Sequence, residues 1–226
     1  MCGFAGLFKP GGLIPEDKTQ LEGMSQAIRF RGPDENSLVA EKKIAFAFRR
    51  LSIIDLSGGS QPKETDDGAV TGVFNGEIYN YRELRETLKD ETFTTNSELE
   101  IMLKLYRLHG EKFVSSLRGM FAIAFYDREK DRVLLARDPF GIKPLYYRVT
   151  KDGLTFASEA KAFLFDPSYD TFRTRDELVQ HYFTYQYMPA KTFSGDLNIL
   201  PAGHYLVYEA ATGEVRTERY FDPMFR

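Results

Sequence analysis

The hydrophobic positions along the chain predict a layered fold of strands and helices. Short apolar runs bounded by turn residues predict strands at Phe4–Phe8, Ser37–Ala40, Ile44–Phe48, Val70–Phe74, Met120–Tyr126, Arg132–Arg137, Leu145–Val149 and Leu154–Ala157, and a last hairpin at His204–Glu209 and Glu214–Phe221. The run Phe121–Phe125 is apolar on both faces, which indicates a sheet covered on both sides. The later strands are short and closely spaced, so antiparallel pairing is expected.

Helical periodicity and capping signals predict the helices. Within residues 16–30, Leu21, Met24 and Ile28 recur at three- and four-residue spacing, as in an amphipathic helix. Asn80 is expected to cap a second helix. Capping boxes are expected to open two further helices, at Ser97 with Glu100 and at Thr174 with Glu177. The Gly-, Ser- and Asp-rich stretch Ser57–Gly68 is expected to be a loop.

Composition limits the class of protein. The chain has 226 residues, 42% of them hydrophobic, with 19 Phe and 13 Tyr, which is enough for a sizeable core. Neither a repeat nor a shift in composition divides it, so one domain is expected. The net charge is −3 and no basic run occurs, which argues against nucleic acid as a partner.

Three expected absences follow from the same sequence. No apolar run approaches about 18 residues and no signal-peptide pattern opens the chain, so no membrane partner is expected. One cysteine precludes an internal disulfide and suits a reducing compartment, so a cytoplasmic protein is expected. That cysteine and three scattered histidines, His109, His181 and His204, argue against a metal site.

Cys2 is the sole cysteine and follows the initiator methionine. A single cysteine is usually a small buried hydrophobic residue. If Met1 is removed, Cys2 carries a thiol and a free α-amine, whose reference pKa of about 7.7–8.0 leaves part of it unprotonated at neutral pH. A nucleophile with its own base is a known catalytic arrangement. Position 2 therefore makes Cys2 a candidate nucleophile.

The pair Asn75-Gly76 has two interpretations. Asn-Gly is the strongest short signal for a hairpin turn, and the pair follows a predicted strand. Alternatively, the Asn75 side-chain amide and the Gly76 backbone N–H could form an oxyanion hole, since such donors can contribute roughly 3–4 kcal/mol in a transition state. The pair alone favours the turn.

Three charged positions are also open to two interpretations. Arg49 and Arg50 end an apolar strand and could be a solvated basic pair. Arginine is, however, also the side chain best suited to bind a carboxylate through two parallel hydrogen bonds. Glu98 lies in the first turn of a predicted helix, where the helix dipole favours a carboxylate. The segment Arg137–Tyr147 combines charge, Pro and Gly between two strands and is expected to be a turn or a rigid loop near a site.

Taken together, six stretches resemble a known family in order and spacing. They are Met1-Cys2-Gly3, Arg31-Gly32-Pro33-Asp34, Arg50-Leu51-Ser52-Ile53-Ile54-Asp55, Asn75-Gly76-Glu77-Ile78-Tyr79-Asn80, Arg137–Tyr147 and Ser158-Glu159-Ala160-Lys161. The chain resembles the class II glutamine amidotransferase domain, most of all the N-terminal half of glutamine-hydrolysing asparagine synthetase. The resemblance implies an α+β fold, a four-layer αββα sandwich of two mainly antiparallel sheets of the N-terminal-nucleophile hydrolase type.

The resemblance also implies a role for each candidate residue. Cys2 would be the nucleophile with its α-amine as base, and Asn75 and Gly76 the oxyanion hole. The substrate would be L-glutamine, held by the remaining residues: Arg50 at the α-carboxylate, Leu51 and Ile53 along the pocket, and Glu77 and Glu98 at the α-ammonium. Two positions depart from the family, which usually has Asp at position 98 and often His at position 48, here Glu98 and Phe48.

The resemblance sets expectations for domains, partners and cofactors. Residues 1–226 would be a single domain, with a core at about 2–210 and residues 211–226 leading into a synthetase domain that this chain lacks. That C-terminal synthetase domain would accept the ammonia and use ATP and Mg; no cofactor is expected in this domain. The oligomeric state, including a homodimer, stays open. The alternatives are another class II amidotransferase, making amino sugars or purine precursors, a non-catalytic module, or a self-processing peptidase.

Overall fold

The computed structural model describes residues 2–51, 59–170, 192 and 196–223. Two six-stranded sheets form its centre. Sheet A has the order β10-β8-β9-β1-β3-β2, with strands β1 Gly3–Phe8, β2 Glu35–Ala40, β3 Ile44–Arg50, β8 Tyr146–Thr150, β9 Gly153–Ala157 and β10 Asn198–Ile199. Sheet B has the order β12-β11-β7-β6-β5-β4, with strands β4 Lys63–Glu64, β5 Val70–Ile78, β6 Gly119–Asp127, β7 Arg132–Arg137, β11 His204–Glu209 and β12 Val215–Arg219. Every strand pairing is antiparallel.

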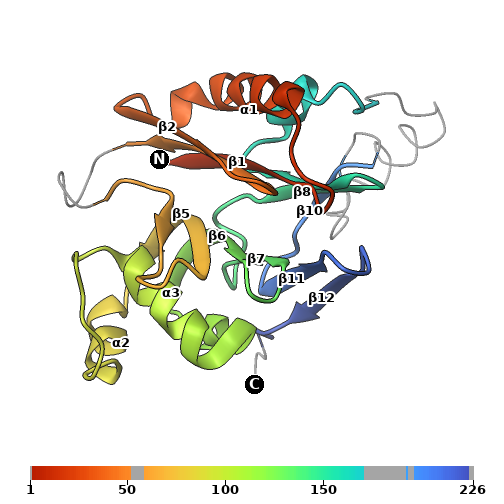
Figure 1. The fold of residues 1–226 in the computed structure, drawn as a ribbon. Helices are drawn as coiled ribbons and strands as arrows, with labels where there is room; N and C mark the ends of the chain where they lie inside the picture. Colours follow the sequence, from red (N-terminus) through yellow and green to blue (C-terminus); the bar gives the residue numbers. More distant parts are fainter. Residues whose placement is uncertain (1, 52–58, 171–191, 193–195, 224–226) are drawn as a thin grey trace.

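Helices cover the outer faces of the two sheets (Figure 1). Helix α1 Pro15–Ala27 lies on sheet A, and helices α2 Tyr81–Thr87 and α3 Glu98–His109 lie on the side of sheet B. The described residues also contain three short 3-10 helices: Arg29–Arg31, Gly110–Ser116 and Ala160–Phe165. The layer order α-β-β-α is the sandwich that the resemblance implied, so the predicted fold class is confirmed.

Alternating side chains divide the core into layers. On β1, Phe4 and Phe8 point toward sheet B, while Ala5 and Leu7 pack under α1 with Leu21 and its neighbours. Period-two alternation is what a strand between two apolar layers requires. The predicted amphipathic helix and the predicted strand are both confirmed.

Sheet B is also buried on both faces. From β6, Phe121, Ile123 and Phe125 pack against α3, while Ala122 and Ala124 face sheet A. The small alanines let the two sheets approach, and the large side chains fill the space beneath the helix. This arrangement confirms the inference from the two-sided apolar run.

The loop predicted at Ser57–Gly68 is partly wrong. It contains a two-residue strand, β4, paired with β5 through Lys63–Gly72 and Glu64–Thr71. Residues 52–58 lie outside the described residues, as does the capping box predicted at Thr174 and Glu177. Residues 215–219, within the stretch assigned to a lead-in, form β12 as the predicted final hairpin requires.

Two predicted capping arrangements are also wrong in detail. Asn80 occupies the N-cap position of α2, but its side chain bonds the Ser116 carbonyl and the Arg118 N–H instead of the helix. Ser97 does cap α3, accepting from the Leu99 N–H at 3.3 Å. Glu100, however, does not return to Ser97; its carboxylate accepts the backbone N–H groups of Thr94 and Thr95 at 2.7 and 2.8 Å. These carboxylate bonds fix the turn before α3.

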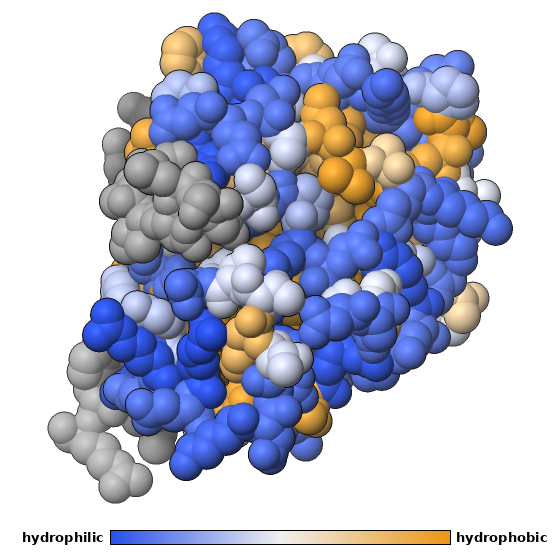
Figure 2. Space-filling model, turned by 60° about the vertical axis from the view of Figure 1, so that its left-hand side comes forward, coloured by the Kyte–Doolittle hydropathy of each residue, from blue (hydrophilic) through white to orange (hydrophobic). Residues whose placement is uncertain are grey.

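The surface turned forward in Figure 2 is mostly hydrophilic, with several separate apolar patches. Among the described residues, no helix has the length and apolar character needed to cross a membrane.

Candidate active site

A cavity of about 300 Å³ brings the predicted site residues together. Seven of the eight candidates line it: Cys2, Arg50, Leu51, Asn75, Gly76, Glu77 and Glu98. The eighth, Ile53, lies outside the described residues. The lining residues come from both sheets and from the start of α3, so the site exists only once the layers are packed together.

Cys2 precedes the buried strand β1, which fixes its position. Its carbonyl accepts a hydrogen bond from Arg31 Nε at 2.9 Å, and Arg31 in turn pairs with Glu159 at 3.0 Å. A Cβ on Gly3 would lie 2.6 Å from Arg31 Cδ, so glycine at position 3 makes room for this arginine. The Cys2 thiol is half-buried and lies 3.4 Å from the Leu51 backbone nitrogen.

Asn75 lies inside β5, and the hairpin interpretation of Asn75-Gly76 is therefore wrong. The strand runs without a turn from Val70 to Ile78. Asn75 is 2% exposed, and its Nδ2 has no hydrogen-bond partner among the described residues. A buried donor without an acceptor costs roughly 1–3 kcal/mol. Because this donor lines the cavity, an oxygen atom of a bound ligand could accept its hydrogen bond.

The register of β5 also fixes the direction of the Gly76 N–H. Gly76 stands opposite Phe121, whose N–H and C=O both bond to Asp138 on the far side of β6. The two residues are therefore a non-hydrogen-bonded pair, and the Gly76 N–H points away from β6. A Cβ at this position would lie 2.0 Å from the Met120 carbonyl oxygen, so only glycine fits.

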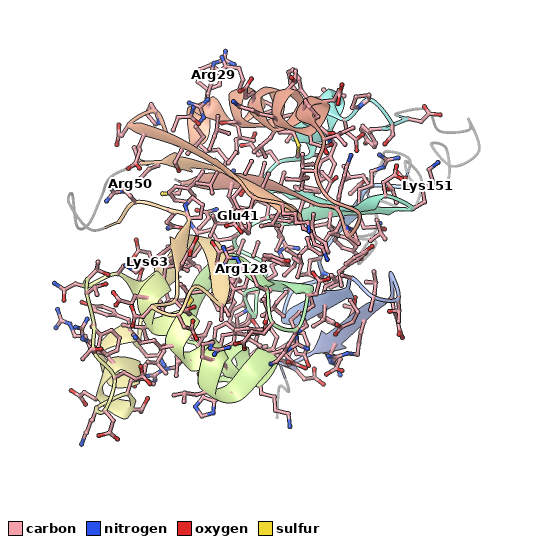
Figure 3. All side chains as sticks on the ribbon, viewed as in Figure 1. Arg29, Glu41, Arg50, Lys63, Arg128 and Lys151 are labelled. Carbon is pink, nitrogen blue, oxygen red and sulfur yellow. The ribbon has the colours of Figure 1, made fainter. Side chains whose placement is uncertain are left out.

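Arg50 ends β3 and is 6% exposed, so the interpretation as a solvated basic pair is wrong for it. Figure 3 shows Arg50 on the same side of the molecule as Lys63, where the chain passes from sheet A to sheet B. Arg50 Nη1 lies 3.3 Å from a Glu35 carboxylate oxygen. Its neighbour Arg49 instead turns to α1, where Nε bonds Ser25 Oγ at 2.9 Å. Among the described residues that line the cavity, Arg50 is the one that carries a guanidinium.

Glu98 is the first residue of α3, and its carboxyl group faces β5. Its Oε1 accepts the Ile78 N–H at 2.6 Å. Burial raises the pKa of Glu98 from 4.5 to about 7; the Ile78 hydrogen bond opposes this rise and the nearby Glu77 carboxylate adds to it. A carboxylate at the helix N-terminus was expected. A carboxyl group whose pKa is raised to about 7 by burial, however, is typical of a cavity and not of a solvated helix end.

The segment Arg137–Tyr147 runs from the end of β7 to the start of β8, and the loop between these strands lies beside the cavity. Asp138 is fully buried and accepts the backbone N–H groups of Phe140, Ile142 and Lys143 at 2.8–3.1 Å. Arg137 bonds the carbonyls of Gly141, Lys143 and Leu200. Lys143 lines the cavity, so the loop contributes to the site as well as to the fold.

The sequence predicted no individual role for several residues of the site. Phe48, Gln61, Phe74 and Lys143 line the cavity, and Arg31 holds the Cys2 carbonyl. Gln61 lies within the stretch predicted as a loop, Ser57–Gly68, and has no local pattern that predicts contact with β5. Among the described residues, no three His, Cys, Asp or Glu side chains come together as metal ligands.

Comparison with known proteins identifies the family. The model of the glutamine amidotransferase domain matches residues 1–221. The chain is 39% identical over 228 residues to asparagine synthetase [glutamine-hydrolyzing] 2 of Bacillus subtilis, covering 98% of this chain and 30% of that protein. It is 37% identical over 231 residues to the synthetase numbered 1 of the same organism, covering 100% and 36%. The chain belongs to the glutamine amidotransferase domain family.

Solved structures support the fold. The B. subtilis glutamine phosphoribosylpyrophosphate amidotransferase, complexed with ADP and GMP, matches with a TM-score of 0.70 at 18% identity, over 97% of this chain and 49% of that one. A structure of the allosteric regulatory enzyme of purine biosynthesis matches with a TM-score of 0.68 at 17% identity, over 98% and 49%. These similarities agree with the N-terminal-nucleophile hydrolase fold that the resemblance implied. The chain spans about a third of the length of the curated relatives it matches.

Proposed function

We propose that this domain hydrolyses L-glutamine to glutamate and ammonia through a thioester on Cys2. One observation carries the proposal: the buried Asn75 Nδ2, which has no hydrogen-bond partner among the described residues, lies in the same cavity as the Cys2 thiol and the Arg50 guanidinium. These groups match the three needs of the reaction, which are a nucleophile, a donor for a developing oxyanion and a cation for the substrate carboxylate.

The reaction needs no group from outside the cavity apart from water. With its α-amine free, Cys2 transfers the thiol proton to that amine, and the thiolate sulfur attacks the side-chain carbonyl carbon of glutamine. Asn75 Nδ2–H and the Gly76 N–H hold the resulting oxyanion. The carbon–nitrogen bond breaks as the ammonium returns its proton, releasing ammonia. Water then adds to the thioester, the carbon–sulfur bond breaks, and glutamate leaves.

The substrate zwitterion gives the remaining residues their roles. Arg50 binds the α-carboxylate, and the ionised carboxylates of Glu77 and Glu98 receive the α-ammonium. Leu51 lies beside the thiol and lines the pocket. The ammonium of bound glutamine stabilises the Glu98 carboxylate, which burial alone disfavours.

The ammonia is proposed to serve an asparagine-synthetase-type domain, which would be C-terminal and would use ATP and magnesium. The identity of 37–39% to glutamine-hydrolysing asparagine synthetases across the whole chain supports this acceptor over amino-sugar or purine-precursor synthesis. The two purine-enzyme structures are under 20% identical and bear on the fold alone.

Glutamate release from glutamine tests the proposal. Purified protein with a free N-terminal Cys2 should release glutamate and ammonia in equal amounts, whereas Cys2→Ala should release none while keeping the same melting temperature. If glutamate is absent from the wild-type reaction, even with a glutamine-dependent synthetase domain present, the domain is a non-catalytic module.

A further inference from the structure

The edge of β5 that faces the cavity is paired with another strand over only part of its length. Strand β4 pairs with β5 only as far as Gly72, and no other described strand continues along this edge. The N–H groups of Phe74, Gly76 and Ile78 all point there, because alternate residues of a strand share a direction. An unpaired edge of this kind normally needs acceptors, since buried N–H groups are almost always bonded.

Two side chains supply acceptors where the strand is missing. Gln61 Oε1 accepts the Phe74 N–H at 2.6 Å, and Glu98 Oε1 accepts the Ile78 N–H at 2.6 Å. Gly76 lies midway between them, and its N–H has no acceptor among the described residues. The Phe74 and Ile78 N–H groups are thus bonded, and the Gly76 N–H between them is left facing the cavity.

Gln61 is held from the other sheet. Its own carbonyl accepts a hydrogen bond from the Ser37 hydroxyl on β2, so the residue spans from sheet A to sheet B. The neighbouring Gly59 contacts Arg50: a Cβ there would lie 2.4 Å from the guanidinium nitrogen Nη2. Residues 59–61 therefore lie against the Arg50 guanidinium through Gly59 and bond β5 at Phe74, beside the oxyanion donors, through Gln61.

We propose that Gln61 is a positioning residue for the oxyanion hole: with Glu98 it replaces the missing strand and keeps the Gly76 N–H aimed into the cavity. This inference rests on the proposed glutaminase function. Gln61 acts through Phe74 and Gly76 and does not touch the reacting atoms. Its loss should impair stabilisation of the oxyanion and leave binding of glutamine intact.

Amide hydrogen exchange, followed residue by residue by NMR, tests the geometry without any assay of activity. In the wild type, the Phe74 and Ile78 amides should be protected and the Gly76 amide should exchange faster than both. Gln61→Met is close in size but lacks the acceptor, and it should lower the protection of Phe74 at least about tenfold. Unchanged protection of Phe74 in Gln61→Met would overturn the inference.

Steady-state kinetics test the catalytic consequence. Gln61→Met should lower kcat roughly 10- to 100-fold, less than the roughly 10²–10³-fold expected for deleting a donor, with little change in KM. Gly59→Ala is the matched control, since it displaces the Arg50 guanidinium and should raise KM with kcat retained. Equal falls in kcat for both variants, or none for Gln61→Met, would contradict the assignment.

The two proposals fail in different ways. A wild type with a free Cys2 that stays inactive even with a synthetase domain present removes the glutaminase proposal, whatever the exchange data show. An active wild type whose kcat survives Gln61→Met removes only the role of Gln61.

Discussion

Glu98 should make the protein less stable as the pH rises through neutrality. The native state holds the carboxyl proton up to about pH 7, whereas an unfolded chain releases it near 4.5. A raised pKa contributes stability that is complete below the lower value and is lost as the pH rises through the upper one. At about 1.36 kcal/mol per pKa unit, the loss is about 3 kcal/mol of unfolding free energy.

Glu98→Gln should abolish this pH dependence. The glutamine keeps an oxygen for the Ile78 N–H but carries no charge, so the variant should be more stable than the wild type at pH 8.5 by about 3 kcal/mol and similar below pH 4.5. Urea denaturation at a series of pH values measures the difference directly. Lowered pKa values at other carboxyl groups, such as Glu100 and Glu111, affect both proteins equally and cancel in the comparison.

Two control variants locate the effect. Glu77→Gln removes the like charge that adds to the rise in the Glu98 pKa, so in this variant the loss of stability should be complete at a lower pH and be somewhat smaller. Because burial is the larger cause of the raised pKa, most of the loss should persist. Glu86→Gln, on the exposed face of α2, should leave the wild-type profile unchanged. Parallel pH profiles for the wild type and Glu98→Gln would refute the account of Glu98.

Three further variants separate the parts of the site. Asn75→Ala should lower kcat about 10²–10³-fold without lowering the melting temperature, because its buried Nδ2 has no hydrogen-bond partner in the described part of the chain; a large rise in KM instead would contradict an oxyanion role. Arg50→Lys should raise the KM for glutamine roughly 10- to 100-fold with kcat retained, as expected for losing a forked contact to a carboxylate; an unchanged KM would place the carboxylate elsewhere. Gly76→Ala should destabilise the fold by roughly 1–3 kcal/mol or more in urea denaturation, since its Cβ meets the Met120 carbonyl, whereas Gly11→Ala, which has open space, should not.

The periodic signals predicted the layers of the fold well. The amphipathic spacing of Leu21, Met24 and Ile28 reflects a helix that buries one face, and the two-sided apolar run in β6 reflects a strand between two cores. Such patterns depend on the side-chain directions within one element, which the sequence specifies directly. The capping box at Ser97 was less reliable because the Glu100 carboxylate had stronger partners in the preceding turn.

The site was predictable only where several motifs combined. By itself, Asn75-Gly76 predicted a hairpin, and that was wrong because β6 pairs with β5 along the whole strand. The roles implied for Cys2, Arg50 and Glu98 came from the order of motifs, and the structure brings these residues into one cavity. Gln61 could not be found in this way, since its contact with β5 depends on the packing of one sheet against the other.

The central claim is that Cys2 acts with its own α-amine as base, and this requires Cys2 to be the first residue. The direct measurement is glutamate release by one preparation before and after removal of a cleavable N-terminal tag that exposes Cys2, with the N-terminus verified by intact mass. Blocking the amine as an amide leaves the thiol in place but removes the base. We expect activity only after the tag is removed, rising with pH as the α-amine loses its proton, near its reference pKa of about 7.7–8.0. Equal glutamate release before and after removal would contradict the account.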